Sequence, residues 1–170
     1  TYVNGSTLMK ALAFGGDQKT YQAWNGVVDL DKIKNNRSYN PAGEYINDNG
    51  ETKYYDNEID KYQQDHYQLH WNERFAENWS SNLALHYTRG EGYFENYKVD
   101  QKLSNYTIEP GVKPDGSPLT RSDLIRRKWL KNDFWGTTFS LNYKNEKTDF
   151  VIGGGANKYE GDHFGNVLWA

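Results

Sequence analysis

Residues 66–88 decide the fold, and they read HYQLHWNERF over 66–75, AENW over 76–79 and SSNLALHYT over 80–88. In the first run the odd positions are nearly all apolar or aromatic, whereas every even position can form hydrogen bonds. A period of two is that of a β-strand, whose successive side chains point to opposite faces. The last run alternates again after the short polar interruption. This stretch therefore predicts two antiparallel strands with one apolar and one polar face.

The same alternation returns near the C-terminus, over 135–143 and 150–157. At the N-terminus Asn4-Gly5 is a strong hairpin signal, although Lys10 shares a face with Leu8, Leu12 and Phe14 and leaves that strand's orientation open. We expect six strands, over about 1–3, 6 to Trp24, 60–75, 80–94, 123–143 and from 148 onward.

The connections between these strands alternate between short and long. Tight turns at 4–5, 76–79 and 144–147 are separated by long polar stretches at about 25–59 and 95–122. Outer-membrane β-barrels have this rhythm, with short periplasmic turns and long extracellular loops. We therefore predict an all-β chain that forms part of an antiparallel up-and-down transmembrane barrel, with both long loops extracellular.

Composition narrows the class of protein. Aromatic residues make up 16% of the chain, all hydrophobic residues only 36%, and the mean hydropathy is −1.00. No apolar run approaches the roughly 20 residues that a membrane-spanning helix needs. The formal net charge of −3 argues against a nucleic-acid partner, which requires a basic excess. Cysteine is absent, so neither disulfides nor thiolate metal sites are expected.

We also expect the chain to be a fragment. It has no initiator methionine or signal peptide, and residues 167–170 continue a strand pattern.

Five segments, taken in order, resemble the barrel domain of TonB-dependent outer-membrane receptors of the Bacteroidetes type. They are Lys19-Thr20-Tyr21-Gln22-Ala23-Trp24, Tyr62-Gln63-Gln64-Asp65-His66-Tyr67, Leu85-His86-Tyr87-Thr88-Arg89-Gly90-Glu91-Gly92-Tyr93-Phe94, Asp123-Leu124-Ile125-Arg126-Arg127-Lys128-Trp129-Leu130 and Gly161-Asp162-His163-Phe164-Gly165. The resemblance implies that residues 1–170 supply five or six strands of a 22-stranded barrel in the bacterial outer membrane. It implies contact with membrane lipid, a plug domain and a TonB complex that engages the plug. Neither plug nor TonB box is present in this sequence, so no functional residue is carried over.

Such a receptor would take up a scarce nutrient, namely siderophore-bound iron, cobalamin or a glycan, without covalent chemistry on it. The alternative is a soluble β-rich carbohydrate-binding or glycosidase domain, for which Glu91 and Glu95 offer a carboxylate pair of unfixed separation. The sequence shows no catalytic motif, so we expect no enzyme and no cofactor.

Candidate ligand-binding residues lie in or beside the long loops. Exposed aromatic rings there would either pack between loops or meet a ligand. A basic cluster near 121–131 would attract an anion, or form a solvated face balanced by Asp123 and Asp133. His66, His70 and His86 are interpreted as polar lumen lining, because strand residues four apart lie about 13 Å from each other, too far to share a metal ion. The predicted substrate-binding residues are Arg126, Arg127, Tyr54, Tyr55, Tyr93 and Phe94.

Overall fold

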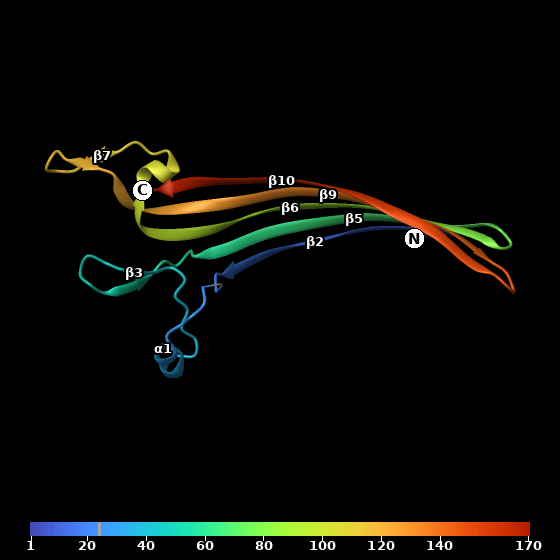
Figure 1. Cartoon of the computed structure of the whole chain (residues 1–170), viewed down its shortest axis with the longest axis horizontal. Coiled ribbons are helices and arrows are strands. Elements are labelled where there is room, and N and C mark those ends of the chain that lie inside the picture. The colour runs from blue at the N-terminus through green and yellow to red at the C-terminus, as the bar shows by residue number, and fades with distance from the viewer. Residues whose placement is uncertain (24) are drawn as a thin grey trace. The chain divides into compact units, whose positions relative to one another are not determined.

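The computed structural model describes residues 1–23 and 25–170, and it is all-β, with 68% of residues in strands and 6% in helices. Six strands form one antiparallel sheet in the order β1-β2-β5-β6-β9-β10 (Figure 1). The strands of this sheet are β1 Tyr2–Asn4, β2 Thr7–Tyr21, β5 Ile59–Ala76, β6 Trp79–Lys102, β9 Arg121–Lys144 and β10 Asp149–Trp169. The predicted all-β antiparallel fold is thereby confirmed. Within the described chain the sheet does not close on itself, and β1 and β10 are its edges.

The short turns lie within one residue of where the sequence predicts them. Asn4 pairs with Thr7, and Gly5 takes a φ of +58° between them. A positive φ at the first central position is typical of a type II′ hairpin turn and suits glycine, which has no Cβ to clash. The strand that follows ends at Tyr21, and Trp24, where its predicted end fell, lies outside the described residues.

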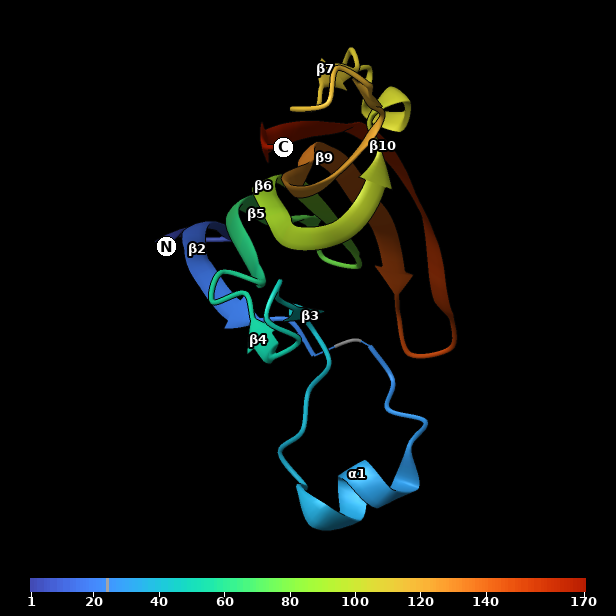
Figure 2. The same cartoon turned by 90° about the vertical axis from the view of Figure 1, so that its left-hand side faces the viewer.

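The two long connections are more ordered than the sequence suggests. Residues 25–58 contain helix α1 (Leu30–Asn35) and a hairpin of β3 (Glu44–Ile46) and β4 (Thr52–Tyr54), all seen in Figure 2. Asp29 explains the helix, because its carboxylate accepts hydrogen bonds from the amides of Asp31 and Lys32 at the helix N-terminus.

The second connection is shorter than predicted, because β6 continues to Lys102 instead of ending near Phe94. A 3-10 helix, η1 (Leu103–Tyr106), and a hairpin of β7 (Gly111–Val112) and β8 (Pro118–Leu119) fill the rest. The side chain of Leu103 is buried, which anchors the start of this connection.

The chain divides into two compact units. Unit 1 comprises Thr1–Asp17, Gln63–Glu91 and Leu130–Asp162, and unit 2 comprises Gln18–Tyr62, Gly92–Trp129 and His163–Ala170. Among the described residues, every buried hydrophobic side chain belongs to unit 2, namely Ala42, Ile59, Leu103 and Leu124. Over 1–23 and 25–170, no helix has the length and apolar character needed to cross a membrane.

Candidate functional site

One face of unit 1 carries two rows of aromatic rings. Phe75, Trp79 and Tyr143 form the first, here called the turn row, with ring centroids 6.4 Å and 4.9 Å apart in that order. Tyr67, Tyr87 and Trp135 form the second, the distal row, with centroids 6.0 Å and 5.6 Å apart. Each row crosses the neighbouring strands β5, β6 and β9.

The spacing between the two rows is the same on all three strands. Tyr67 and Phe75, Trp79 and Tyr87, and Trp135 and Tyr143 are each eight positions apart. At about 3.3 Å per strand residue, this separation is about 26 Å along the strand. Even spacing on one side of the strands also confirms the period of two read from the sequence.

The face between the rows is apolar and lies open. Tyr67 is 50% exposed, Leu69 37%, Trp71 43% and Phe75 56%, whereas the even-numbered residues between them on β5 are mostly half-buried. Water-soluble sheets normally bury the apolar face and expose the polar one. Strand β5 shows the reverse arrangement.

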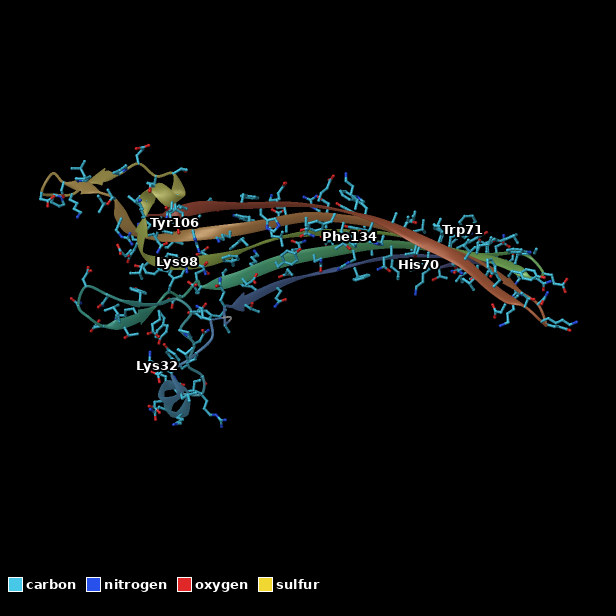
Figure 3. The ribbon with its side chains drawn as sticks, in the orientation of Figure 1. Lys32, His70, Trp71, Lys98, Tyr106 and Phe134 are labelled. Carbon is cyan, nitrogen blue, oxygen red and sulfur yellow. The ribbon has the colours of Figure 1, made fainter. Side chains whose placement is uncertain are left out.

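The opposite face of unit 1 carries the predicted lumen-lining histidines (His70 and Phe134 are labelled in Figure 3). His66 Nδ1 lies 2.9 Å from Thr88 Oγ1, and its ring stacks on Phe14 with centroids 4.8 Å apart. His86 packs against Phe134 with centroids 4.9 Å apart. Each of these two histidines thus contacts a ring or a hydroxyl on a neighbouring strand. In the described part of the chain, no group of three or more His, Cys, Asp or Glu side chains could hold a metal ion.

The same contacts settle the orientation of β2. Phe14 stacks on His66, so Lys10, two strand periods away, lies on the polar face. Met9, Ala11 and Ala13 alternate with Lys10 and Phe14 and therefore lie on the opposite face. The apolar face of β2 thus carries two alanines beside Met9, while Leu8, Leu12 and Phe14 share the other face with Lys10, which is why its sequence pattern is ambiguous.

Glu73 is the exception on the apolar face, and its partners are Ser6, in the turn before β2, and Thr7, the first residue of β2. Its carboxylate accepts hydrogen bonds from Ser6 Oγ at 2.7 Å and from Thr7 Oγ1 at 2.5 Å. The Glu73 carboxylate, which lies close to the hairpin turns, thus has two hydroxyl donors that stabilise its charge.

Beyond the distal row, unit 1 becomes highly charged. A groove of about 470 Å³ is lined in part by Arg89, Glu91, Lys131 and Asp133. Lys131 Nζ lies 2.8 Å from one oxygen of Glu91, and Arg89 lies 3.9 Å from the other. Glu91 is thus a paired carboxylate, flanked by two cations.

A buried polar cluster of unit 2 surrounds Glu95 on β6. The Glu95 side chain is 2% exposed and accepts hydrogen bonds from Tyr55 Oη and Asn57 Nδ2, both at 2.5 Å, and from Arg127 Nε at 2.6 Å. Burial alone would raise the pKa of Glu95, but these three donors outweigh it and hold the pKa below its usual value. A saturated carboxylate of this kind stays ionised and cannot deliver a proton as a general acid.

A second buried network lies beside the first and closes the base of the 25–58 connection. Asn96 Nδ2 donates to Gln22 Oε1 at 2.9 Å and to Glu58 Oε1 at 2.6 Å. Gln22 Nε2 donates to the carbonyl oxygens of Ile59 at 2.7 Å and Glu95 at 3.0 Å. Both ends of the connection are thereby tied to β6, since Gln22 precedes it and Glu58 ends it.

Tyrosine rings cover this network. Tyr97 packs on Tyr45, with centroids 4.6 Å apart, and on Tyr55, with centroids 5.8 Å apart, while its hydroxyl donates to Asp123. Burial is the largest cause of a rise in the pKa of Tyr55 to about 12, followed by its hydrogen bond to Glu95. Burial and the Asp123 carboxylate raise the pKa of Tyr97 in the same way. Both hydroxyls therefore act as hydrogen-bond donors at neutral pH.

The structure brings together only some of the predicted binding residues. Tyr55 and Arg127 both contact Glu95, and the guanidinium of Arg127 lies 4.2 Å from the centre of the Tyr93 ring. The signal that predicted them, exposed aromatics beside a basic cluster, did not reveal the buried carboxylate that joins them.

The other three predicted residues lie elsewhere in unit 2. Arg126 Nη1 contacts Tyr106 Oη at 3.0 Å, and Lys128 lies over the ring of Phe94. Tyr54 belongs to the β3–β4 hairpin, where its hydroxyl donates to Glu44 at 3.0 Å. Arg126 and Arg127 have different partners because adjacent strand residues point to opposite faces.

The fold and these clusters define the class as an antiparallel β-sheet protein that exposes an aromatic-banded face. Comparison with protein-family models, with curated proteins and with solved structures finds no match to the chain.

Proposed function

We propose that this chain is part of the wall of a bacterial outer-membrane β-barrel, in a receptor of the TonB-dependent type that imports a scarce nutrient. The observation that carries the proposal is the pair of aromatic rows eight positions apart on three successive strands. Outer-membrane barrels have an apolar band about 25 Å tall, flanked at both interfaces by aromatic girdles. A spanning strand needs about 9–11 residues, and the segment from Tyr67 to Phe75 meets that length.

Exposure supports the same proposal. Rings and leucines that are 37–56% exposed would be costly in water but are stabilised against lipid tails. The polar face, with its histidines, amides and hydroxyls, suits a water-filled or plug-filled lumen. The connections at 25–58 and 103–120 would then lie on the extracellular side, opposite the tight turns.

The receptor type rests on the resemblance of the five segments and on the alternation of short and long connections. In such a receptor the nutrient crosses without covalent change, driven by an inner-membrane complex that acts on a plug domain. A glycosidase based on Glu91 and Glu95 is disfavoured, because the first is ion-paired to Lys131 and the second accepts three hydrogen bonds.

The full-length protein produced in a Gram-negative host tests the proposal. We expect it to sediment with the outer membrane, to resist extraction by urea, and to migrate differently in gels when the sample is left unheated. Removing the host's energy-coupling protein should abolish uptake while leaving the folded barrel in place. Recovery of the unaggregated protein in the soluble fraction would refute the membrane assignment.

A further inference from the structure

The charged groove of unit 1 lies on the same face as the distal row. Its charged side chains come from β6, β9 and β10, which are adjacent in the sheet (Figure 1), and they are Arg89, Glu91, Lys131, Asp133, Glu160 and Asp162. On β6 and β9 they lie two or four positions from Tyr87 and Trp135 of the distal row, and therefore on the same face. On β10 they lie two or four positions from Lys158, whose Nζ is 5.9 Å from the centre of the Trp135 ring.

In the proposed barrel this groove lies at the depth of lipid headgroups. The distal row is then the aromatic girdle on the side away from the tight turns, and Arg89 and Asp133 lie two positions beyond it, about 7 Å along the strands. The headgroup layer on each side of a bilayer is about 5–8 Å thick. On the other side of the row, the exposed side chains of Leu69 and Leu85 would contact acyl chains. This placement rests on the proposed function.

The groove presents charges of both signs. Two cations and four carboxylates line it. Both cations share Glu91, at 2.8 Å from Lys131 and 3.9 Å from Arg89, and the Arg89 side chain is 63% exposed. Within residues 1–23 and 25–170, Asp162 forms no ion pair, and it is exposed. A ligand thus meets an accessible guanidinium at one side of the groove and an accessible carboxylate at the other.

We propose that this groove binds the phosphoethanolamine headgroup of a membrane lipid whose acyl chains lie on the apolar face of unit 1. The phosphate pairs with Arg89 on β6, and the ammonium donates hydrogen bonds to Asp162 on β10. A purely anionic headgroup would meet twice as many carboxylates as cations. A choline headgroup has no N–H to donate to a carboxylate.

Purified full-length protein in detergent tests the proposal when it is offered equal amounts of three lipids with identical acyl chains. They are phosphatidylethanolamine, phosphatidylcholine and phosphatidylglycerol, and native mass spectrometry counts the molecules of each that remain bound. We expect phosphatidylethanolamine to be retained about threefold over either of the others, which is within the range that one exposed ion pair supplies.

Two substitutions separate the two halves of the headgroup. Asp162→Asn removes the partner of the ammonium and should reduce retention of phosphatidylethanolamine to that of phosphatidylcholine. Arg89→Gln removes the partner of the phosphate and should weaken retention of both these lipids alike, by about threefold. Asp149→Asn makes the same change as the first substitution at the other end of β10, outside the groove. It is the matched control and should retain lipids as the unaltered protein does.

Equal retention of the three lipids by the unaltered protein would overturn the proposal, as would a preference that Asp162→Asn leaves intact. Displacement of phosphatidylethanolamine by lipid A without ethanolamine would also overturn it, because the groove would then recognise phosphate alone. Gel migration of unheated samples shows that each variant has folded. Because membrane sedimentation and urea resistance are measured on the same protein, loss of the lipid preference remains distinct from failure of the membrane proposal.

Discussion

The same kind of antiparallel sheet is stabilised by opposite kinds of contact in unit 1 and in unit 2. Unit 2 contains every buried hydrophobic side chain of the described residues, together with the networks around Glu95 and Glu58. Unit 1 leaves its apolar face open and pairs its polar face through contacts such as His66 with Thr88. Unit 2 thus contains much of the buried apolar surface and many of the hydrogen bonds that stabilise it. Unit 1 instead needs surroundings that cover its apolar face.

The largest effect expected from this difference concerns the 170-residue chain alone. In plain buffer it should aggregate, because the apolar face of unit 1 and the unpaired edges β1 and β10 remain uncovered. Size-exclusion chromatography with light scattering measures this, with detergent-containing buffer as the control. A monodisperse monomer that melts cooperatively without detergent would contradict the membrane proposal.

The next prediction tests which face of unit 1 meets lipid. In the full-length protein Leu69→Arg should destabilise the folded barrel by about 2–4 kcal/mol, because the charge would enter the apolar band between the aromatic rows. His70→Gln, on the adjacent residue, should cost much less, since glutamine can still hydrogen-bond on the polar face. Urea titration of folding into bilayers measures both variants. A harmless Leu69→Arg with a severe His70→Gln would place the lumen and the lipid on the opposite faces.

The strands of unit 1 could be predicted from the sequence because the polarity of each side chain indicates which face of the strand it lies on. Alternation in 66–75 and 135–143 and the turn at Asn4-Gly5 are local signals, and the structure has strands and turns at those places. The orientation of β2 was not predictable, because its apolar face carries two alanines beside Met9, while Phe14 lies on its polar face. Only contact with a neighbouring strand identifies such a face.

The clusters of unit 2 depend on residues far apart in the sequence. Gln22, Glu58 and Asn96 meet only after the 25–58 connection folds back, and no spacing rule predicts that meeting. The extension of β6 to Lys102 was missed for a related reason. Its last residues are polar and charged, and they are held by long-range contacts such as that between Tyr97 and Asp123.

An effect of intermediate size is expected for the hydrogen-bond network around Glu95 in unit 2. Glu95→Gln should loosen the end of the 25–58 connection by about 1–3 kcal/mol, because one amide cannot replace an ionised acceptor of three hydrogen bonds. Hydrogen exchange of residues 52–59 should accelerate, while exchange in 135–143 of unit 1 should not change. Equal acceleration in both segments would mean that the network stabilises more than this connection.

Acid should have the same effect as that substitution. The folded-state pKa of Glu95 lies below its usual value, so its contribution is complete above about pH 4.3 and is lost as pH falls through the lower folded value. Exchange of residues 52–59 should therefore accelerate on acidification, and Glu95→Gln should remove much of that pH dependence. An unchanged pH profile in the variant would assign the acid sensitivity to another carboxylate.

The smallest expected effect separates the two neighbouring arginines. Arg126 has no carboxylate partner in the described part of the chain, whereas the charge of Arg127 is compensated by Glu95. If the basic cluster attracts an anionic nutrient, Arg126→Gln should slow uptake about two- to threefold at low salt, with a weaker effect at high salt where the charge is screened. Arg127→Lys, which retains its charge, should leave uptake of that anion unchanged at every salt concentration.

Uptake by whole cells measures the rate, and gel migration of unheated samples confirms that both barrels have formed. Normal uptake by Arg126→Gln at low salt would assign the cluster to a solvated face. Protease treatment of intact cells checks the sidedness on which this depends, because cleavage within 25–58 only after permeabilisation would place the arginines on the periplasmic side.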